Sequence, residues 1–269
     1  MNPRKKRRVA ITNNKGGTMK TSGTVGLAEA LASAGHSVLV VDMDPQRNAS
    51  RRLGIPNEHS QTHPTVSEAI KAAQPGIAGE AVVPCGWEDD FASRISVLPA
   101  RFELENRISE AAVMGAVRRL DVVLEGVDDD IDITLVDCQP SVGHLTQMAL
   151  SAVGGVLVMS APEYDDIDGG VRVRNFVAQQ AENLHNPELE FFGVVPTRVR
   201  ENLGAHQYQL EGLEEIFGAD NIWSPLLPER TAVKDASDAA VALRSFRSGK
   251  EVAALFDELG RVLAKRVGL

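Results

Sequence analysis

The chain has 269 residues, which is enough for one domain with a large buried core, and its formal net charge is −9. Its two cysteines, Cys85 and Cys138, form no C-x-x-C pair, so neither a disulfide framework nor a zinc site is expected and a cytoplasmic location is the default. No apolar run reaches the length of a membrane span, and the basic N-terminus lacks the apolar stretch of a secretory signal.

The first predicted elements are a short apolar strand at residues 8–12, a glycine turn, and a helix from about residue 21 to residue 34. Glycines let backbone N–H groups turn around an anion, and the start of a helix attracts negative charge. Lys20 would reach the β- and γ-phosphates, and the hydroxyl of Thr21 would bind Mg²⁺. The turn therefore predicts a nucleotide-phosphate site made of Gly16, Gly17, Thr18, Met19, Lys20, Thr21 and Ser22.

This turn departs from the common pattern G-x-x-x-x-G-K-[ST], because Asn14 and Met19 stand at the two glycine positions. The variant that fits is K-G-G-x-x-K-[ST], with Lys15 as an additional lysine. We expect Met19 to take ordinary helical torsions with its side chain directed away from the phosphates. The alternative is that Met19 crowds the γ-phosphate and slows hydrolysis.

A second strand at residues 38–41 ends in two acids, Asp42 and Asp44. Its four apolar residues predict a buried parallel strand, and ligands of such sheets bind outside the carboxyl ends of the strands. If this strand neighbours the first, both acids emerge beside the glycine turn. The segment that follows, residues 54–102, is the least regular, with a short helix near residues 65–72 and a hairpin-like excursion.

A third apolar strand, residues 131–136, ends in Asp137, which fits the aspartate that holds Mg²⁺ in nucleotide sites, usually through a water. Further strands are predicted at residues 155–159 and 191–195, with a helix at about 168–184 between them. Strands that alternate with helices predict an α/β fold with a doubly wound, mostly parallel sheet flanked by helices.

The chain ends in a helical pattern over residues 250–267 with one apolar face. We expect this helix to pack on the core. The alternative is a membrane anchor at residues 261–269, which Asp257 and Glu258 disfavour on anionic lipid. The apolar positions on this face are Val252, Leu255, Phe256, Leu259, Val262 and Leu263.

Positive charge is local rather than global, and a surface that binds duplex DNA needs only local positive charge. Five basic residues occupy positions 4–8. Besides residues 4–8, the candidates for DNA contacts are Arg198, Arg200, Arg244, Arg247, Lys250, Arg261, Lys265 and Arg266. The alternative for all of these basic residues is that they form a solvated tail and solvated helix faces.

Taken together, these motifs resemble the ParA/MinD family of ATPases with a deviant Walker A loop, over about residues 7–266. The string D-x-D-P-Q at residues 42–46 looks like the family's switch I, and residues 163–169 look like its E-Y-x-x-x-x-G stretch. Pro140 agrees with the family's D-x-x-P, whereas Gln139 departs from it. Residues 227–230 resemble a loop that packs on the adenine, with a mismatch at Glu229.

The resemblance implies a P-loop NTPase that hydrolyses ATP with Mg²⁺ as an ATP-dependent homodimer. Lys15 would act across the dimer, Asp44 would orient the attacking water, and Asp42 would support the Mg²⁺ shell. The catalytic residues implied are thus Lys15, Lys20 and Asp44, the metal residues are Thr21, Asp42 and Asp137, and adenine contacts come from Pro228 and Arg230.

The resemblance also implies DNA segregation, with a dimer that binds double-stranded DNA without sequence preference and a ParB-type partner that stimulates hydrolysis. The protein would be nucleoid-associated and no membrane is expected. Residues 1–8 would form a basic N-terminal segment and residues 9–269 a single ATPase domain. The alternatives are a MinD-like positioning ATPase on the membrane, a metabolic relative, and a scaffold that does not hydrolyse ATP.

Overall fold

The computed structural model of the chain describes residues 4–200 and 204–269, and seven strands in these ranges form one sheet. The strand order is β3-β4-β2-β5-β1-β6-β7, and all neighbours are parallel except β3 and β4. The predicted doubly wound, mostly parallel sheet is confirmed. The strands are β1 (Arg8–Thr12), β2 (Val38–Met43), β3 (Val83–Pro84), β4 (Ile95–Leu98), β5 (Ile133–Cys138), β6 (Gly155–Ser160) and β7 (Glu190–Pro196).

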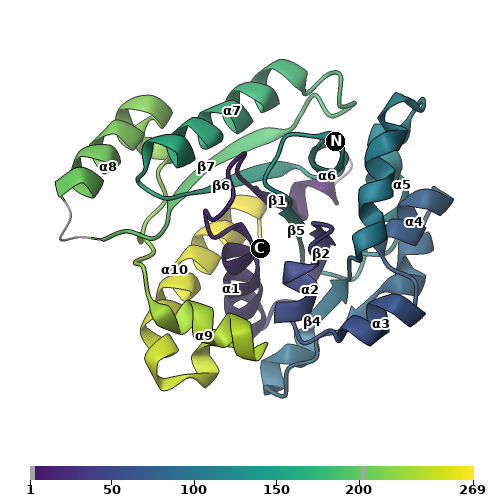
Figure 1. Ribbon diagram of the computed structural model, residues 1–269, viewed down its shortest axis with the longest axis horizontal. Coiled ribbons are helices and arrows are strands. Elements are labelled where there is room, and N and C mark those ends of the chain that lie inside the picture. Colours follow the sequence, from purple (N-terminus) through teal and green to yellow (C-terminus); the bar gives the residue numbers. More distant parts are fainter. Residues whose placement is uncertain (1–3, 201–203) are drawn as a thin grey trace.

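Helices cover both faces of this sheet (Figure 1). Residues of α1, α9 and α10 pack on one face, and residues of α4, α5, α6 and α7 pack on the other. The helices are α1 (Lys20–Ser33), α2 (Asn48–Arg52), α3 (Asn57–Thr62), α4 (Val66–Ala72), α5 (Arg119–Val123), α6 (His144–Ala152), α7 (Tyr164–Gln180), α8 (Gly204–Phe217), α9 (Thr231–Ala239) and α10 (Lys250–Val267).

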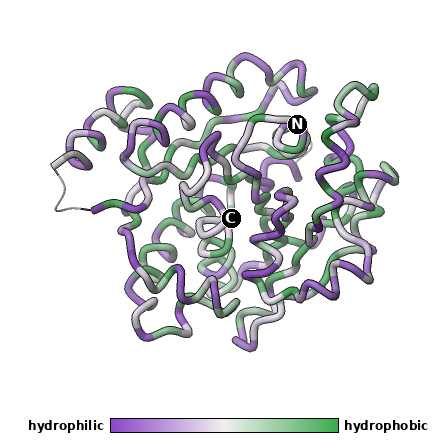
Figure 2. The backbone as a smooth tube through the Cα atoms, in the orientation of Figure 1, coloured by the Kyte–Doolittle hydropathy of each residue, from purple (hydrophilic) through white to green (hydrophobic). Residues whose placement is uncertain are grey.

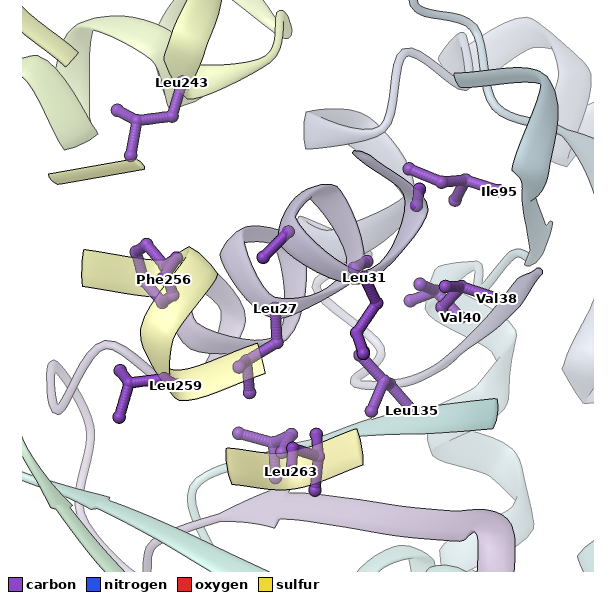
Figure 3. Packing of buried hydrophobic residues seen from close by; sticks show 14 of the residues in the cluster. Leu27, Leu31, Val38, Val40, Ile95, Leu135, Leu243, Phe256, Leu259 and Leu263 are labelled. Carbon is purple, nitrogen blue, oxygen red and sulfur yellow. The ribbon is translucent and has the colours of Figure 1, made fainter. Parts of the chain in front are cut away.

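Each central strand contributes alternate residues to two separate cores, because successive side chains in a strand point to opposite faces. In β2, Val38 and Val40 belong to the core under α1 and α10, and Leu39 and Val41 belong to the core on the other face. Figure 3 shows the first of these cores, with Leu31 lying over the sheet. Along the outer helices, hydrophilic residues are interspersed with hydrophobic ones (Figure 2).

Helix α10 packs closely on α1, and glycines make this approach possible. A Cβ added to Gly26 would lie 2.6 Å from the ring of Phe256, and a Cβ added to Gly260 would lie 3.2 Å from the Cβ of Ala30. The expected core-packing helix is confirmed, and its apolar face is not available as a membrane anchor. Val262 is the exception, because it is 41% exposed. In the described ranges, no helix is both long enough and apolar enough to cross a membrane.

The strand order corrects one expectation about the acids. β2 does not neighbour β1, because β5 lies between them. The register sets Asp137 of β5 opposite both Ile11 of β1 and Asp42 of β2. Asp137 therefore stands between the glycine turn and the second strand's acids. The irregular segment does contain the expected short helix, α4, and the antiparallel pair β3–β4.

The basic N-terminal segment is partly built into the fold, although its residues 1–3 lie outside the described ranges. β1 begins at Arg8, one residue earlier than the predicted domain boundary. Arg8 is 2% exposed, and its guanidinium donates to the carboxylates of Asp128 and Asp121. Lys5 also pairs with Asp121. Arg8 is therefore a buried structural residue and is not available for DNA.

Candidate functional site

The glycine turn joins the end of β1 to the start of α1 and curls around its own lysine. Lys20 is only 7% exposed, and its Nζ donates to the backbone oxygen of Lys15 at 2.6 Å. Asn13 fixes the start of the turn, because its Nδ2 donates to the backbone oxygens of Met159 and Asp166 at 2.8 and 3.1 Å. The turn is thereby anchored to both β6 and α7.

Met19 takes a left-handed conformation, with φ 67° and ψ 23°. Our expectation of helical torsions at this position is wrong. The chain turns sharply here to begin α1, since the backbone oxygen of Met19 already accepts from the N–H of Gly23 at 2.7 Å. A residue with a side chain pays about 1–2 kcal/mol for this conformation, which glycine takes freely. The turn keeps the backbone geometry of a glycine although the glycine itself is missing.

Asp137 lies beneath the first turn of α1. Its carboxylate accepts from the hydroxyls of Thr21 at 2.8 Å and Thr24 at 3.0 Å. Burial, together with the charge of Asp42, raises the pKa of Asp137 to about 7. Thr21 and Asp137 thus meet as predicted, and a divalent cation bound near them would favour the ionised carboxylate.

The oxygen donors at this point suit Mg²⁺, which is bound in proteins by one or two carboxylates together with phosphate oxygens and waters. In the described ranges no group of three or more His, Cys, Asp and Glu side chains could hold a metal by itself. A cation beside Thr21 and Asp137 would therefore need phosphate and water oxygens to complete its shell.

Asp42 and Asp44 have different surroundings although both follow β2. Asp42 is fully buried and accepts from the N–H and hydroxyl of Ser50, at 2.8 and 2.7 Å, and from the N–H of Asp44. Burial raises its pKa to about 6. Asp44 lines the pocket and accepts from the N–H of Gln46 at 2.9 Å. Asp42 thus holds the loop that presents Asp44, and its place in a Mg²⁺ shell stays a prediction.

The glycine turn and this loop enclose an open pocket of about 280 Å³. All seven predicted phosphate-binding positions and Asp44 line it. Sequence reasoning missed Asn48 and Arg52, because the run of polar and basic residues at 46–52 does not show which side chains face the turn. The lining residues are Gly16, Gly17, Thr18, Met19, Lys20, Thr21, Ser22, Asp44, Gln46, Asn48, Arg52 and Pro140.

Lys15, the additional lysine, lies outside this lining. Its Nζ pairs with the carboxylate of Asp165 at the start of α7, at 2.9 Å, and its side chain is 44% exposed. The hydrogen bond to Asp165 and the negative charge of that carboxylate raise the pKa of Lys15. Its predicted action across a dimer stays a prediction.

Arg198 links the expected adenine loop, residues 227–230, to the glycine turn. The Nη1 of Arg198 lies 3.5 Å from the backbone oxygen of Gly17, and its Nε lies 3.6 Å from Glu229. Pro228 and Arg230 do not line the pocket described above, and the guanidinium of Arg230 lies 3.6 Å from Glu251. Adenine contacts from Pro228 and Arg230 therefore stay predictions.

The candidates for DNA contacts separate into two groups. Arg244 is held by Glu29 at 2.7 Å and by Asp257 at 2.8 Å, so it joins α1 to α10 and serves the core. Three others also pair with acids: Arg198 and Arg200 with Glu229, and Arg266 with Glu190. Among the candidates beyond residues 4–8, those that are exposed and have no carboxylate partner within the described ranges are Arg247, Lys250, Arg261 and Lys265.

Comparison with known proteins agrees with this geometry. Residues 6–191 match the family model AAA_31, described as an AAA domain. The chain is 31% identical to the sporulation initiation inhibitor protein Soj of Bacillus subtilis, covering 85% of this chain and 86% of the relative. It is also 31% identical to the chromosome-partitioning ATPase Soj of Thermus thermophilus, covering 86% and 85%.

The fold has a solved counterpart in the ATP complex of a McdA variant from Cyanothece. That structure superposes with a TM-score of 0.83 over 98% of this chain and 96% of its own, at 19% identity. The seven-stranded sheet, the lysine-rich glycine turn and the matches to both Soj proteins lead to one assignment. The chain belongs to the ParA/MinD family of deviant Walker A ATPases.

Proposed function

We propose that this protein is a ParA-type ATPase for DNA segregation, which binds ATP with Mg²⁺ in the pocket at the glycine turn and hydrolyses it. The observation that carries the proposal is the meeting of three strand ends around one pocket. Lys20 follows β1 and Asp44 follows β2, and both line the pocket; Asp137, near the end of β5, lies behind the lining, where it accepts from Thr21. Phosphate, metal and water could each find a partner there.

The glycine turn would neutralise the phosphates. Gly16 to Thr21 line the pocket, so their backbone N–H groups could donate to a phosphate there, and Lys20 lies inside the turn. Burial lowers the pKa of Lys20, so a phosphate beside it would favour the charged amine. Lys20 would exchange the backbone oxygen of Lys15 for phosphate oxygens when nucleotide binds.

Thr21 and Asp137 would hold the Mg²⁺, the latter through a water. When bound, the cation neutralises charge that develops on the phosphate oxygens. Asp44 would orient the attacking water, and its loop is kept in place by the hydrogen bonds to Asp42.

Binding of ATP would cause the protein to dimerise and then to bind DNA. Lys15 is exposed beside the pocket, where it could reach the nucleotide of a second copy once released from Asp165. The Thermus relative is named a chromosome-partitioning ATPase, which supports the same task here. Arg247, Lys250, Arg261 and Lys265 are our candidates for contacts to duplex DNA of any sequence. A ParB-type partner would stimulate hydrolysis, and the protein would be cytoplasmic and nucleoid-associated.

Asp44→Ala tests the proposal. A carboxylate that positions water matters mainly in the transition state, so the variant should lose turnover while it keeps ATP affinity. It should remain dimeric with ATP and stay on DNA longer than the wild type. The measurements are phosphate release, sedimentation, and binding of two unrelated duplexes with ATP, with ADP and without nucleotide. Equal DNA binding in all three nucleotide states would refute the proposal that ATP controls DNA binding. Loss of ATP affinity in Asp44→Ala would make Asp44 a structural residue.

A further inference from the structure

We propose that Arg52 is a nucleotide ligand whose guanidinium binds a phosphate present in both ADP and ATP. This inference rests on the proposed function, since it concerns the same pocket. Arg52 is the last residue of α2, far from the glycine turn in the sequence, yet its side chain lines the pocket beside Ser22. It adds a second cation to a wall that otherwise has only Lys20.

The guanidinium of Arg52 has donors to spare. Its Nη1 donates to the hydroxyl of Ser22 at 2.7 Å, whereas its Nε is buried and has no partner in the described ranges. No carboxylate of these ranges lies within ion-pair distance of it. Arg8, which is more deeply buried, has two carboxylate partners instead.

A partly buried cation with no carboxylate in contact is unfavourable. Burial lowers the pKa of Arg52, and the charges of Asp137 and Asp238 offset this only in part. Arginine remains charged at neutral pH, so the site gains most from an anion that enters the pocket. A phosphate oxygen next to Ser22 would supply the missing negative charge and accept from the free donors. Charge-assisted hydrogen bonds of this kind are among the stronger ones in proteins.

The backbone holds Arg52 in this position from both sides. Asp42 fixes Ser50 of α2 through two hydrogen bonds, and the Nε1 of Trp87 donates to the backbone oxygen of Arg52 at 2.8 Å. The next residue, Leu53, accepts from the N–H of Gly86 at 2.8 Å. The side chain is thus presented by a short helix that is held at its middle and at its C-terminal end.

The position of Ser22 indicates which phosphate is bound. Thr21 with Asp137 marks the metal side of the pocket, and Asp44 marks the attacking water at the γ-phosphate. Arg52 is bonded to Ser22, one residue further into α1 than Thr21. We therefore assign Arg52 to the part of the phosphate chain that remains after hydrolysis, so its removal should lower the affinity for ADP as much as the affinity for ATP.

Arg52→Met tests this, since it keeps an apolar stem of similar length and removes the charge. The control is Arg51→Met, because the Nη1 of Arg51 donates to the backbone oxygen of Ser237 at 2.9 Å and Arg51 does not line the pocket. Calorimetry with Mg²⁺ gives the affinities for ADP and for a non-hydrolysable ATP analogue. Thermal unfolding without nucleotide reports any purely structural role.

We expect Arg52→Met to weaken both nucleotides about 10- to 100-fold, to a similar extent, with the melting temperature of the nucleotide-free protein unchanged or raised. Arg52→Lys should recover part of the affinity, and Arg51→Met should leave it unchanged. Unaltered affinity in Arg52→Met, or a loss confined to the ATP analogue, would overturn the inference. A lower melting temperature with unaltered affinity would show that Arg52 only joins α2 to α1. Failure of the wild type to bind ADP would overturn the proposed function itself.

Discussion

Replacing Arg8 by Met should remove a buried cation at the start of the central strand β1. The Nε and Nη2 of Arg8 donate to the two carboxylate oxygens of Asp128, each at 2.7 Å, and its Nη1 donates to Asp121 at 3.2 Å. Asp128 is 3% exposed and also accepts from the hydroxyl of Thr134. The substitution therefore leaves a buried carboxylate without its counter-ion.

The expected loss in the free energy of unfolding is about 3–5 kcal/mol, the usual cost of removing one partner of a buried pair. For a domain of this size that corresponds to a fall of about 6–20 °C in melting temperature. The double variant Arg8→Met/Asp128→Asn should recover part of the loss, because it removes the stranded charge as well. Lys6→Met is the control, since Lys6 is exposed, and it should change stability by about 0.5 kcal/mol or less.

Urea unfolding followed by circular dichroism at pH 7, without nucleotide, measures the wild type, Arg8→Met, the single variant Asp128→Asn, the double variant and Lys6→Met. The double-mutant cycle isolates the coupling between Arg8 and Asp128. A loss of less than about 1 kcal/mol in Arg8→Met would refute the reasoning, because a buried, uncompensated carboxylate costs more than that. A double variant less stable than Arg8→Met would also refute it, since the stranded charge would then not be the source of the loss.

Met19→Gly should raise the free energy of unfolding by up to about 1 kcal/mol, because relief of the left-handed strain exceeds the entropy cost of glycine; Met19→Ala, which keeps the Cβ, should give no such gain in urea unfolding. Gly26→Ala should lower it by about 1–3 kcal/mol despite the better helix propensity of alanine, because the new Cβ would meet the ring of Phe256; a stabilised variant would contradict this packing. Burial raises the pKa of the Cys85 thiol to about 11 and also raises that of Cys138. Because the thiolate is the reactive form, a thiol dye should label the native protein slowly at pH 8 and faster as the pH rises toward 11, and rapid labelling at pH 7 would count against the buried environment.

The sequence alone was sufficient to predict which residues of the glycine turn gather at one pocket, and the class of fold. The glycines, Lys20 and Thr21 are adjacent along the chain, and a strand followed by a glycine turn and a helix brings their groups together without help from the rest of the molecule. Apolar strands that end in acids predicted Asp44 near the pocket and Asp137 beside Thr21, because parallel strands place their carboxyl ends at one edge. The periodicity of residues 250–267 predicted a helix with a buried face.

Contacts between distant segments were decided only by the tertiary structure. β5 is inserted between β1 and β2, and no local pattern gives the order of strands within a sheet. Arg8 and Arg244 look like members of basic clusters in the sequence, but the fold brings them against Asp128 and Glu29, more than a hundred residues away. Arg52 becomes a candidate ligand only because α2 folds back beside Ser22. The sequence thus shows which residues are charged. Three-dimensional packing determines which counter-ion each of them meets, and therefore whether it has a structural or a binding role.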